Sequence, residues 1–463
     1  MPGVTLRAQS LLLGAFVTFA LLAGTLLISR GLGRINATVA SKPVYDLVVD
    51  WKGARAFIEG YNPYSPEGQR RAELTATGLG HPPTTLFWIV PLARFPLKIA
   101  REVLLQVSLL LLLIELILMA REFRVPAAWP SAWLTFGLVL SCDWIDYLLF
   151  LGQISQLIAF AYFLAWYCLR RGWDARAGLA VGAACTLKAF PGVLLLFLAL
   201  ARRWRALAAA AALYLAVAAV MTARFGFLAW PQFVQQLHGD ADRWMASIQN
   251  QAIHGMVLRF FNPVCEPRGP TLPLATAIST IGALALLGGV AWLARNAGQT
   301  RERIDLPFAL AAVLSVFTSN WAWEHYNVLF ILPVVTGLTY LWRLRGRRGL
   351  GSGWTVVAAT LLGLVLVTLP VPILEKANLQ SAYLQHPELH FRLHFFEALN
   401  MVPVIGLTLS LAVLLWRSER QVAAQALAVV AAADQPPAAG GPGGAVPAAA
   451  ALARAARRAS RSA

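Results

Sequence analysis

Charged residues are scarce in this sequence, at 13% of its 463 residues, while hydrophobic residues make up 58%. Soluble domains carry roughly twice that charged fraction, so the composition excludes an ordinary soluble protein. Carboxylates are the scarcer sign, because 22 Asp and Glu stand against 39 Lys and Arg. A net charge of +17 would suggest nucleic-acid binding in a soluble chain. Here the arginines gather at the ends of apolar runs, which is typical of the cytoplasmic loops of membrane proteins.

Cysteine is also scarce. The four cysteines have no spacing that suggests a disulfide framework or a metal knuckle. Apolar runs of nearly membrane-spanning length are abundant instead. They cover about 10–28, 103–120, 131–149, 154–169, 206–222, 272–294, 306–319, 326–341, 354–373 and 399–416. The sequence therefore predicts an all-α polytopic integral membrane protein, whose first run is long for a signal peptide and is interpreted as a retained helix.

A topology of ten spans with both termini in the cytoplasm places every arginine cluster on the inside. Three outer loops are then long, at about 30–102, 223–271 and 374–398, and all seven histidines fall in outer segments. Any chemistry is therefore expected at the extracytoplasmic face. Residues 1–423 form the membrane domain, and the Ala/Pro/Gly-rich tail 424–463 is predicted to be disordered in the cytoplasm.

Two segments do not fit simple spans. Residues 177–200 have arginine clusters at both ends, with Lys188 and Pro191 in the middle. A broken or re-entrant hairpin would keep both clusters inside, and irregular backbone is tolerated at membrane depth where it lines a protein cavity. Residues 84–97 are too short and too proline-rich for an ordinary span. We expect them to form an interfacial helix or a short crossing.

The stretch "YDLVVDWKGARAFIEGYNPYS", residues 45–65, combines aspartates with aromatic residues in a chain that has few carboxylates. Flanking proline and glycine residues predict a helix here. One apolar stripe at helical spacing consists of Leu47, Trp51, Ala54 and Ile58. The neighbouring face carries Asp46 and Asp50 over Gly53, whose lack of a side chain is expected to leave room for a ligand. On residue types alone, the polar face of a solvated helix is the alternative.

Four blocks of the sequence carry a family resemblance. They are "DLVVDWKGARAFIEGYNPY", "HPPTTLFWIVPLARFP", the segment from "LGQISQ" to "LKAFPG", and "SNWAWEHYNVLFILP". In this order they resemble glycosyltransferase family 87, the polyprenyl-phosphate-mannose-dependent α-(1→2)-mannosyltransferase-like membrane proteins of the GT-C type. The similarity runs from about residue 10 to 416.

The resemblance implies a GT-C-type bundle of about 10–12 transmembrane helices. It also implies inverting transfer of a hexose, with mannose as the first expectation, from a polyprenyl-phosphate donor to a hydroxyl of a glycolipid or lipid-anchored glycan. The chain departs from the family pattern at two positions, because His81 and Asp50 stand where the family often has tyrosine.

An inverting displacement of this kind needs a general base for the acceptor hydroxyl and donor groups for the leaving phosphate. The resemblance implies that Asp46 is the catalytic base. Asp50, one helical turn further on, is expected to raise the pKa of Asp46 by charge repulsion. Binding of an acceptor hydroxyl, or plain solvation, is the alternative for Asp50.

Several polar residues are candidates for binding the donor phosphate or sugar. Lys188 is an ionisable residue in an apolar segment, which is a functional hypothesis by default, although bracing of the hairpin explains it equally well. His325 is a candidate phosphate ligand that Glu324 would orient, with a local helix cap as the alternative. The remaining candidates are Arg259 and His254 in an outer loop, Gln153 at the start of a span, and His81. An ordered loop is the alternative for Arg259, and helix capping for Gln153.

A metal site is not predicted, and neither is a cofactor. His386, His390 and His394 fall at i, i+4 and i+8. The outer two would lie roughly 12 Å apart on a helix, too far for one ion. A two-histidine site is geometrically possible, but a surface helix face is the preferred interpretation.

Two other functions remain open. A transporter or flippase for a polyprenyl-linked sugar would suit broken helices and a buried lysine, although the sequence has no inverted repeat. An arabinofuranosyl or glucosyl transferase of the same fold cannot be separated by residue types. A catalytically inactive assembly factor is disfavoured by the intact Asp46, "NPY" and "EH" blocks.

Overall fold

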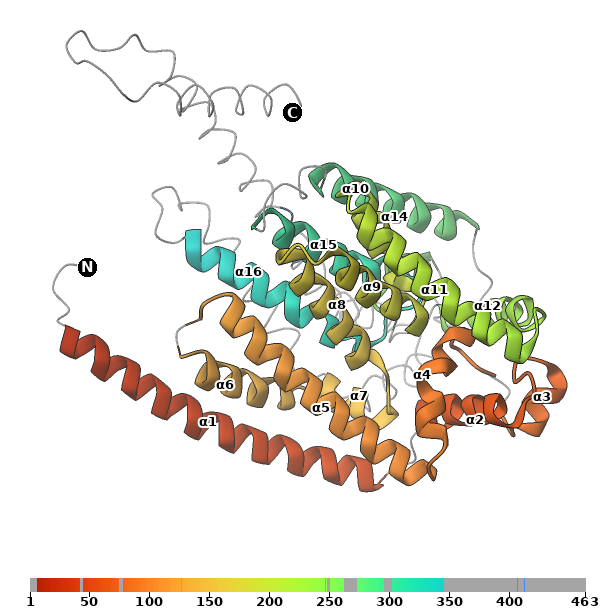
Figure 1. Cartoon of the computed structure of the whole chain (residues 1–463), viewed down its shortest axis with the longest axis horizontal. Coiled ribbons are helices and arrows are strands. Elements are labelled where there is room, and N and C mark those ends of the chain that lie inside the picture. Colours follow the sequence, from red (N-terminus) through yellow and green to blue (C-terminus); the bar gives the residue numbers. More distant parts are fainter. Residues whose placement is uncertain are drawn as a thin grey trace, which may run out of the picture.

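A computed structural model of the chain describes residues 6–41, 45–74, 78–125, 127–245, 247, 250–261, 273–294 and 302–344, with isolated residues at 406 and 412. Every regular element in these ranges is a helix (Figure 1). In chain order they are α1 (Leu6–Ser41), α2 (Tyr45–Glu59), α3 (Pro66–Arg71), α4 (Pro83–Ala93), α5 (Leu97–Glu122), α6 (Ala128–Leu140), α7 (Asp143–Leu151), α8 (Ser155–Arg170), α9 (Asp174–Leu187), the 3-10 helix η1 (Phe190–Gly192), α10 (Val193–Leu200), α11 (Trp204–Phe225), α12 (Ala229–Trp244), α13 (Ile253–Phe261), α14 (Pro273–Ala294), α15 (Glu302–Phe317), the 3-10 helix η2 (Glu324–Phe330) and α16 (Ile331–Leu344).

Some predictions concern residues outside these ranges. They are the spans 354–373 and 399–416, the loop 374–398 with its three histidines, the domain boundary at 423 and the tail 424–463. They stay predictions.

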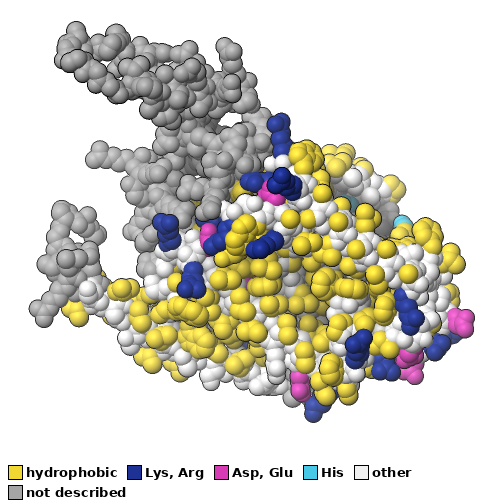
Figure 2. All heavy atoms as spheres, in the orientation of Figure 1, with side chains coloured by type: hydrophobic (Ala, Val, Ile, Leu, Met, Phe, Trp, Pro, Cys, Tyr) yellow, Lys and Arg dark blue, Asp and Glu magenta, His cyan; other side chains and the backbone are white. Residues whose placement is uncertain are grey.

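Among the described residues, three helices are long and apolar enough to cross a membrane. They are Ser10–Ala37 within α1, α5 and α11, and the bent pair of α6 and α7 would make a fourth. Figure 2 shows a broad hydrophobic band with lysine and arginine side chains along its two borders, where their charged ends can reach the polar headgroup regions. The chain is an all-α polytopic membrane protein, as its composition predicts.

The apolar run 131–149 was expected to form one span, but it forms two helices that meet at 74°. The backbone of Cys142 is extended there, which ends α6 and starts α7. Arg34 of α1 donates to the carbonyls of Leu140 and Cys142 over 3.1 and 3.2 Å, and its Nε lies 2.6 Å from Asp146. Carbonyls freed by the break are therefore satisfied by an arginine from another helix, a long-range partner that local sequence does not reveal.

The structure contains the hairpin expected at 177–200. Helix α9 ends where Lys188 adopts an extended backbone, and the chain returns through η1 and α10. Asp174 at the start of α9 accepts a hydrogen bond of 3.2 Å from Arg203, which follows α10. Both ends of the hairpin therefore meet at one end of the bundle, while Lys188 lies at its turn.

Helix α11 then runs beside α9 at very short separation. A Cβ added to Gly178 would lie 2.0 Å from the carbonyl oxygen of Ala206, and one added to Gly182 would lie 2.7 Å from that of Ala210. Small residues four apart on both helices thus permit the close backbone approach that is typical of membrane helix pairs.

The segment 84–97 contains all but the first residue of α4, whose 11 residues extend roughly 16 Å at 1.5 Å per residue. This is too short for a hydrocarbon core of about 30 Å, so it does not form an ordinary crossing. Thr85 of α4 donates 2.7 Å to the carbonyl of Leu187, which places α4 beside the end of α9. Helices α2, α3 and α4 lie together at one end of the molecule, at the right in Figure 1; we call this the site end.

The opposite end is rich in arginine and is joined by buried ion pairs. Arg170 Nε of α8 lies 3.0 Å from Glu122 of α5, and its Nη1 pairs with Asp305 of α15. Arg171 lies 2.8 Å from Glu122, and Trp166 donates 2.9 Å to Asp305. The 16 residues of α8 separate this end from the site end by roughly 24 Å.

Asp305→Ala is expected to destabilise the protein strongly. Asp305 is fully buried, so its removal leaves Arg170 Nη1 and Trp166 Nε1 without their buried acceptor and Arg170 with Glu122 alone, at a cost on the order of 3–5 kcal/mol. Thermal unfolding in detergent would show a lowered Tm. The control is Asp174→Ala, because its pair with Arg203 lies at the surface with side chains 22% and 20% exposed, and such pairs contribute about 0–1 kcal/mol. Equal Tm values for the two variants would contradict the expectation.

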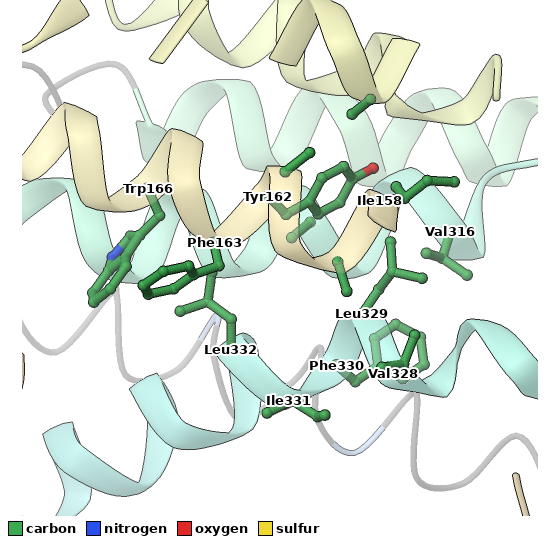
Figure 3. Packing of buried hydrophobic residues seen from close by; sticks show 14 of the residues in the cluster. Ile158, Tyr162, Phe163, Trp166, Val316, Val328, Leu329, Phe330, Ile331 and Leu332 are labelled. Atoms are coloured by element: carbon green, nitrogen blue, oxygen red, sulfur yellow. The ribbon is translucent and has the colours of Figure 1, made fainter. Parts of the chain in front are cut away.

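Helix α8 also forms the centre of the hydrophobic core. Figure 3 shows Ile158, Tyr162, Phe163 and Trp166 of α8 against Val316 of α15 and the segment 328–332 from η2 and α16. The last residues of η2, 328–330, are thereby packed against α8. This arrangement brings two distant parts of the chain to the site end.

Candidate active site

The predicted helix of the opening acidic stretch is α2, which ends before Gly60 with a positive φ of 84°. Leu47 and Ala54 of the predicted apolar stripe are fully buried, while Ile58 is 39% exposed. The expectation of a ligand space over Gly53 is wrong. A Cβ there would lie 2.8 Å from Leu79 Cδ2, so the missing side chain admits a leucine and not a ligand.

Asp46 is joined to Lys188 through one amide. Gln153 Nε2, just ahead of α8, donates to Asp46 Oδ2, and Lys188 Nζ donates 3.2 Å to Gln153 Oε1. Lys188 also donates 2.9 Å to the hydroxyl of Tyr326 in η2. Asp46 Oδ1 has no hydrogen-bond partner within the described ranges. The structure thus collects a carboxylate, an amide, an ammonium and a phenol from four separate segments.

Burial raises the pKa of Asp46 above the usual value of a carboxyl group. The hydrogen bond from Gln153 and the charges of His81 and Lys188 oppose this rise, while the charge of Asp50 adds to it. The direction agrees with the sequence-based expectation, but the main cause is desolvation and not repulsion by Asp50. A carboxylate with a raised pKa is a stronger general base.

His325 lies beside this group. It is 2% exposed, and neither ring nitrogen has a hydrogen-bond partner among the residues that the structure describes. Its ring lies against Tyr326 and Tyr147, with centroids 4.6 and 5.9 Å away. A buried polar group without a partner costs free energy, so these nitrogens suit the polar atoms of a ligand. No side-chain cap bond opens η2, so helix capping does not explain His325.

Asp50 and His81 are in hydrogen-bond contact. His81 Nδ1 lies 2.7 and 2.9 Å from the two carboxylate oxygens of Asp50. The hydroxyl of Tyr64, from the "NPY" motif, donates 2.9 Å to the carbonyl of His81 and so fixes its backbone. The two positions at which the chain departs from the family pattern are therefore in contact with each other.

The remaining candidates lie around the entry to η2. Arg259 of α13 donates to the carbonyls of Ser247 and Asn250 over 2.6 and 2.9 Å. Asn250 in turn accepts from the amide of Ala322 over 2.9 Å, close before Glu324. These bonds show Arg259 as part of an ordered loop that supports η2, the alternative stated for it above. Glu324 is buried at 8% exposure, and His254 of α13 is half-buried.

Two residues of the site were not identified from the sequence. Tyr326 directly follows "WEH" in the sequence, and its position next to His325 was the signal that could have identified it. Tyr147 contacts His325 and lies within electrostatic reach of Asp46 and Glu324; nothing in its local sequence distinguishes it from other aromatic residues of the bundle. Within the described residues, no group of three or more His, Cys, Asp or Glu is arranged to hold a metal.

Comparisons with known proteins identify the family of the chain. The model of glycosyltransferase family 87 matches residues 80–319. These residues include His81, Gln153 and Lys188, whereas Asp46 precedes them and His325 follows them. The polyprenol-phosphate-mannose-dependent alpha-(1-2)-phosphatidylinositol pentamannoside mannosyltransferase of Mycolicibacterium smegmatis is 32% identical over 216 residues. That match covers 46% of this chain and 49% of the relative, about half of its length.

No solved structure matches the chain. The family model covers more than half of the 463 residues. The chain therefore belongs to glycosyltransferase family 87.

Proposed function

We propose that the protein transfers mannose from a polyprenyl-phosphate donor to a hydroxyl of a glycolipid that carries mannose, with inversion at the anomeric carbon. The observation that carries this proposal is the linkage of Asp46 to Lys188 through Gln153, since it sets a base and a cation on two sides of one amide. The printed name of the mycobacterial relative supports the choice of donor, sugar and acceptor class.

Asp46 is the base in this proposal. Its Oδ1 takes the proton of the acceptor hydroxyl while the oxygen of that hydroxyl bonds to the anomeric carbon. The bond from the anomeric carbon to the phosphate oxygen breaks at the same time, and its electron pair leaves with the lipid phosphate. One displacement of this kind inverts the anomeric centre without a covalent sugar–enzyme intermediate.

Lys188 and His325 are the groups that meet the leaving phosphate. Lys188 is 6% exposed and is already oriented by Gln153 and Tyr326. Positive charge fixed in a site of low polarity stabilises a leaving group more than it would in water. His325 presents ring nitrogens that lack other partners in the described ranges, and Glu324 precedes it in the same helix.

The distribution of arginines supports an extracytoplasmic reaction face in this proposal. Arg170, Arg171 and Arg203 lie at the end of the bundle opposite to Asp46. Because cytoplasmic loops carry the excess of arginine, this arrangement favours an extracytoplasmic site, with both termini in the cytoplasm.

The direct test is sugar transfer by the purified protein in nanodiscs. Polyprenyl-phosphate-[14C]mannose would be supplied with phosphatidylinositol mannosides, and labelled product would be separated by thin-layer chromatography. Label in the acceptor supports the proposal. Donors carrying glucose or arabinofuranose are the comparison, and transfer from either in place of mannose would overturn the sugar assignment. No transfer with any donor, together with movement of the donor across vesicles, would favour a flippase.

Transfer is expected to fall as the pH falls through the pKa of Asp46. The base works only when deprotonated, and its pKa is raised by burial, so the acid limb of kcat/KM should lie above the usual range of an aspartate. Gln153→Leu removes a hydrogen bond that lowers this pKa, so its acid limb should move to higher pH. An acid limb that stays in place in Gln153→Leu would contradict the assignment of Asp46.

A further inference from the structure

The pair formed by Asp50 and His81 is fixed in one orientation. The Asp50 carboxylate is nearly fully buried, with a side chain 4% exposed, whereas that of His81 is 15% exposed. Asp50 is held by α2, and His81 is held by the Tyr64 hydrogen bond and by the prolines that start α4. Because Asp50 occupies Nδ1, the imidazole presents Nε2 as its remaining polar atom, and no residue of the described ranges bonds to it.

This pair lies on the acidic side of the site. Asp46 and Asp50 both belong to α2, and His81 lies near enough for its charge to lower the pKa of Asp46. Lys188 comes from the turn between α9 and η1 and His325 from η2, so the cationic and unpaired donor groups lie on other segments. A leaving phosphate carries about 1.5–2 negative charges and is repelled by two carboxylates. The α2 side therefore suits an uncharged reactant.

The chemistry of the pair suits a hydroxyl. A neutral imidazole whose Nδ1–H donates to a carboxylate has a lone pair on Nε2, which accepts from an O–H. A protonated imidazole donates from Nε2 to the oxygen of the same hydroxyl. Asp50 sets the ring orientation in both states, as carboxylates do for histidine in other sites.

We propose that His81, positioned by Asp50, binds a hydroxyl of the acceptor sugar next to the hydroxyl that Asp46 deprotonates. This inference rests on the proposed function and adds a residue that selects the acceptor. It moves His81 from the donor side, where the sequence placed it, to the acceptor side. The ligand class is a pyranose ring with neighbouring hydroxyls, and contact with one of them determines which neighbour reaches Asp46.

The test measures the KM of each substrate separately. Octyl α-mannopyranoside serves as a minimal acceptor and polyprenyl-phosphate-[14C]mannose as the donor. His81→Phe is expected to raise the acceptor KM at least tenfold and to change the donor KM less than twofold. Asp50→Asn should raise the acceptor KM by a smaller factor, because the asparagine oxygen can still accept from Nδ1 of His81, although it carries no negative charge. His81→Gln, which retains a donor and an acceptor, should recover most of the acceptor affinity.

Deoxy acceptors give a readout that a merely structural role would not move. Among the monodeoxy octyl mannosides that keep the reacting hydroxyl, one should be used at least tenfold less well than the parent by the wild type. His81→Phe should use that analogue and the parent equally. An acceptor KM unchanged in His81→Phe, or a donor KM raised in its place, would overturn the inference. These ratios can be measured only if the wild type transfers mannose. A wild type without transfer activity therefore refutes the proposed function. An active wild type whose ratios are the same as those of His81→Phe refutes only the role of His81.

Discussion

Asp46→Asn is expected to reduce sugar transfer by about 10²–10⁴-fold, the usual contribution of a general base. Asparagine has nearly the same shape and keeps an oxygen that can accept the hydrogen bond of Gln153, so the packing of α2 should persist. It cannot take up the proton of the acceptor hydroxyl. The loss should therefore appear in kcat, with the donor KM nearly unchanged, in the nanodisc assay with labelled donor.

The matched control is Glu59→Gln on the same helix. It makes the same chemical change at a carboxylate that is 37% exposed and pairs only with Arg55 and Arg71 among the contacts seen. Its transfer rate should equal that of the wild type. If Asp46→Asn retained more than a tenth of the wild-type rate, Asp46 would not be the base, and the mechanism would need another carboxylate.

Lys188→Gln is expected to have the second largest effect, a fall in kcat of about 10²–10³-fold, which is the usual cost of removing one group that stabilises developing charge. Glutamine preserves hydrogen bonding toward Gln153 and Tyr326 but removes the positive charge. A second signature follows from electrostatics. The charge of Lys188 lowers the pKa of Asp46, so its removal should move the acid limb of the rate profile to higher pH.

Tyr326→Phe separates the charge of Lys188 from its orientation. The hydroxyl of Tyr326 accepts from Lys188, and its ring lies 4.5 Å from Nζ, so phenylalanine keeps the ring and removes one acceptor. A fall of less than tenfold is expected, because the net worth of one hydrogen bond is about 0.5–1.5 kcal/mol. If both variants lost transfer equally, the phosphate role of Lys188 would be contradicted in favour of bracing the hairpin.

Much of this architecture follows from local patterns. Helical spacing and flanking residues predicted α2, and arginines at both ends of 177–200 predicted the hairpin that carries Lys188 to the site end. The bend between α6 and α7 was not predictable, since no proline or glycine marks it and its freed carbonyls are satisfied by Arg34 from a distant helix.

The site itself was predicted as a set of residues and not as an arrangement. Asp46, Gln153, Lys188 and His325 were named separately, but only folding shows which of them share hydrogen bonds. The contact between Asp50 and His81 joins positions 31 residues apart, and no periodicity reports such pairing. Gly53 was misinterpreted for the same reason, because the leucine that fills its space lies outside the helix.

The amide of Gln153 has a consequence for how the site keeps its charges. A carboxylate and an ammonium placed in direct contact in a poorly polar region would pass a proton between them or bind each other so firmly that neither would meet a substrate. Gln153 holds them one amide apart, with its N–H toward Asp46 and its oxygen toward Lys188. An amide does not titrate in the physiological range, so Gln153 orients both groups without passing a proton between them. Asp46 and Lys188 therefore both keep their charges until the substrates bind.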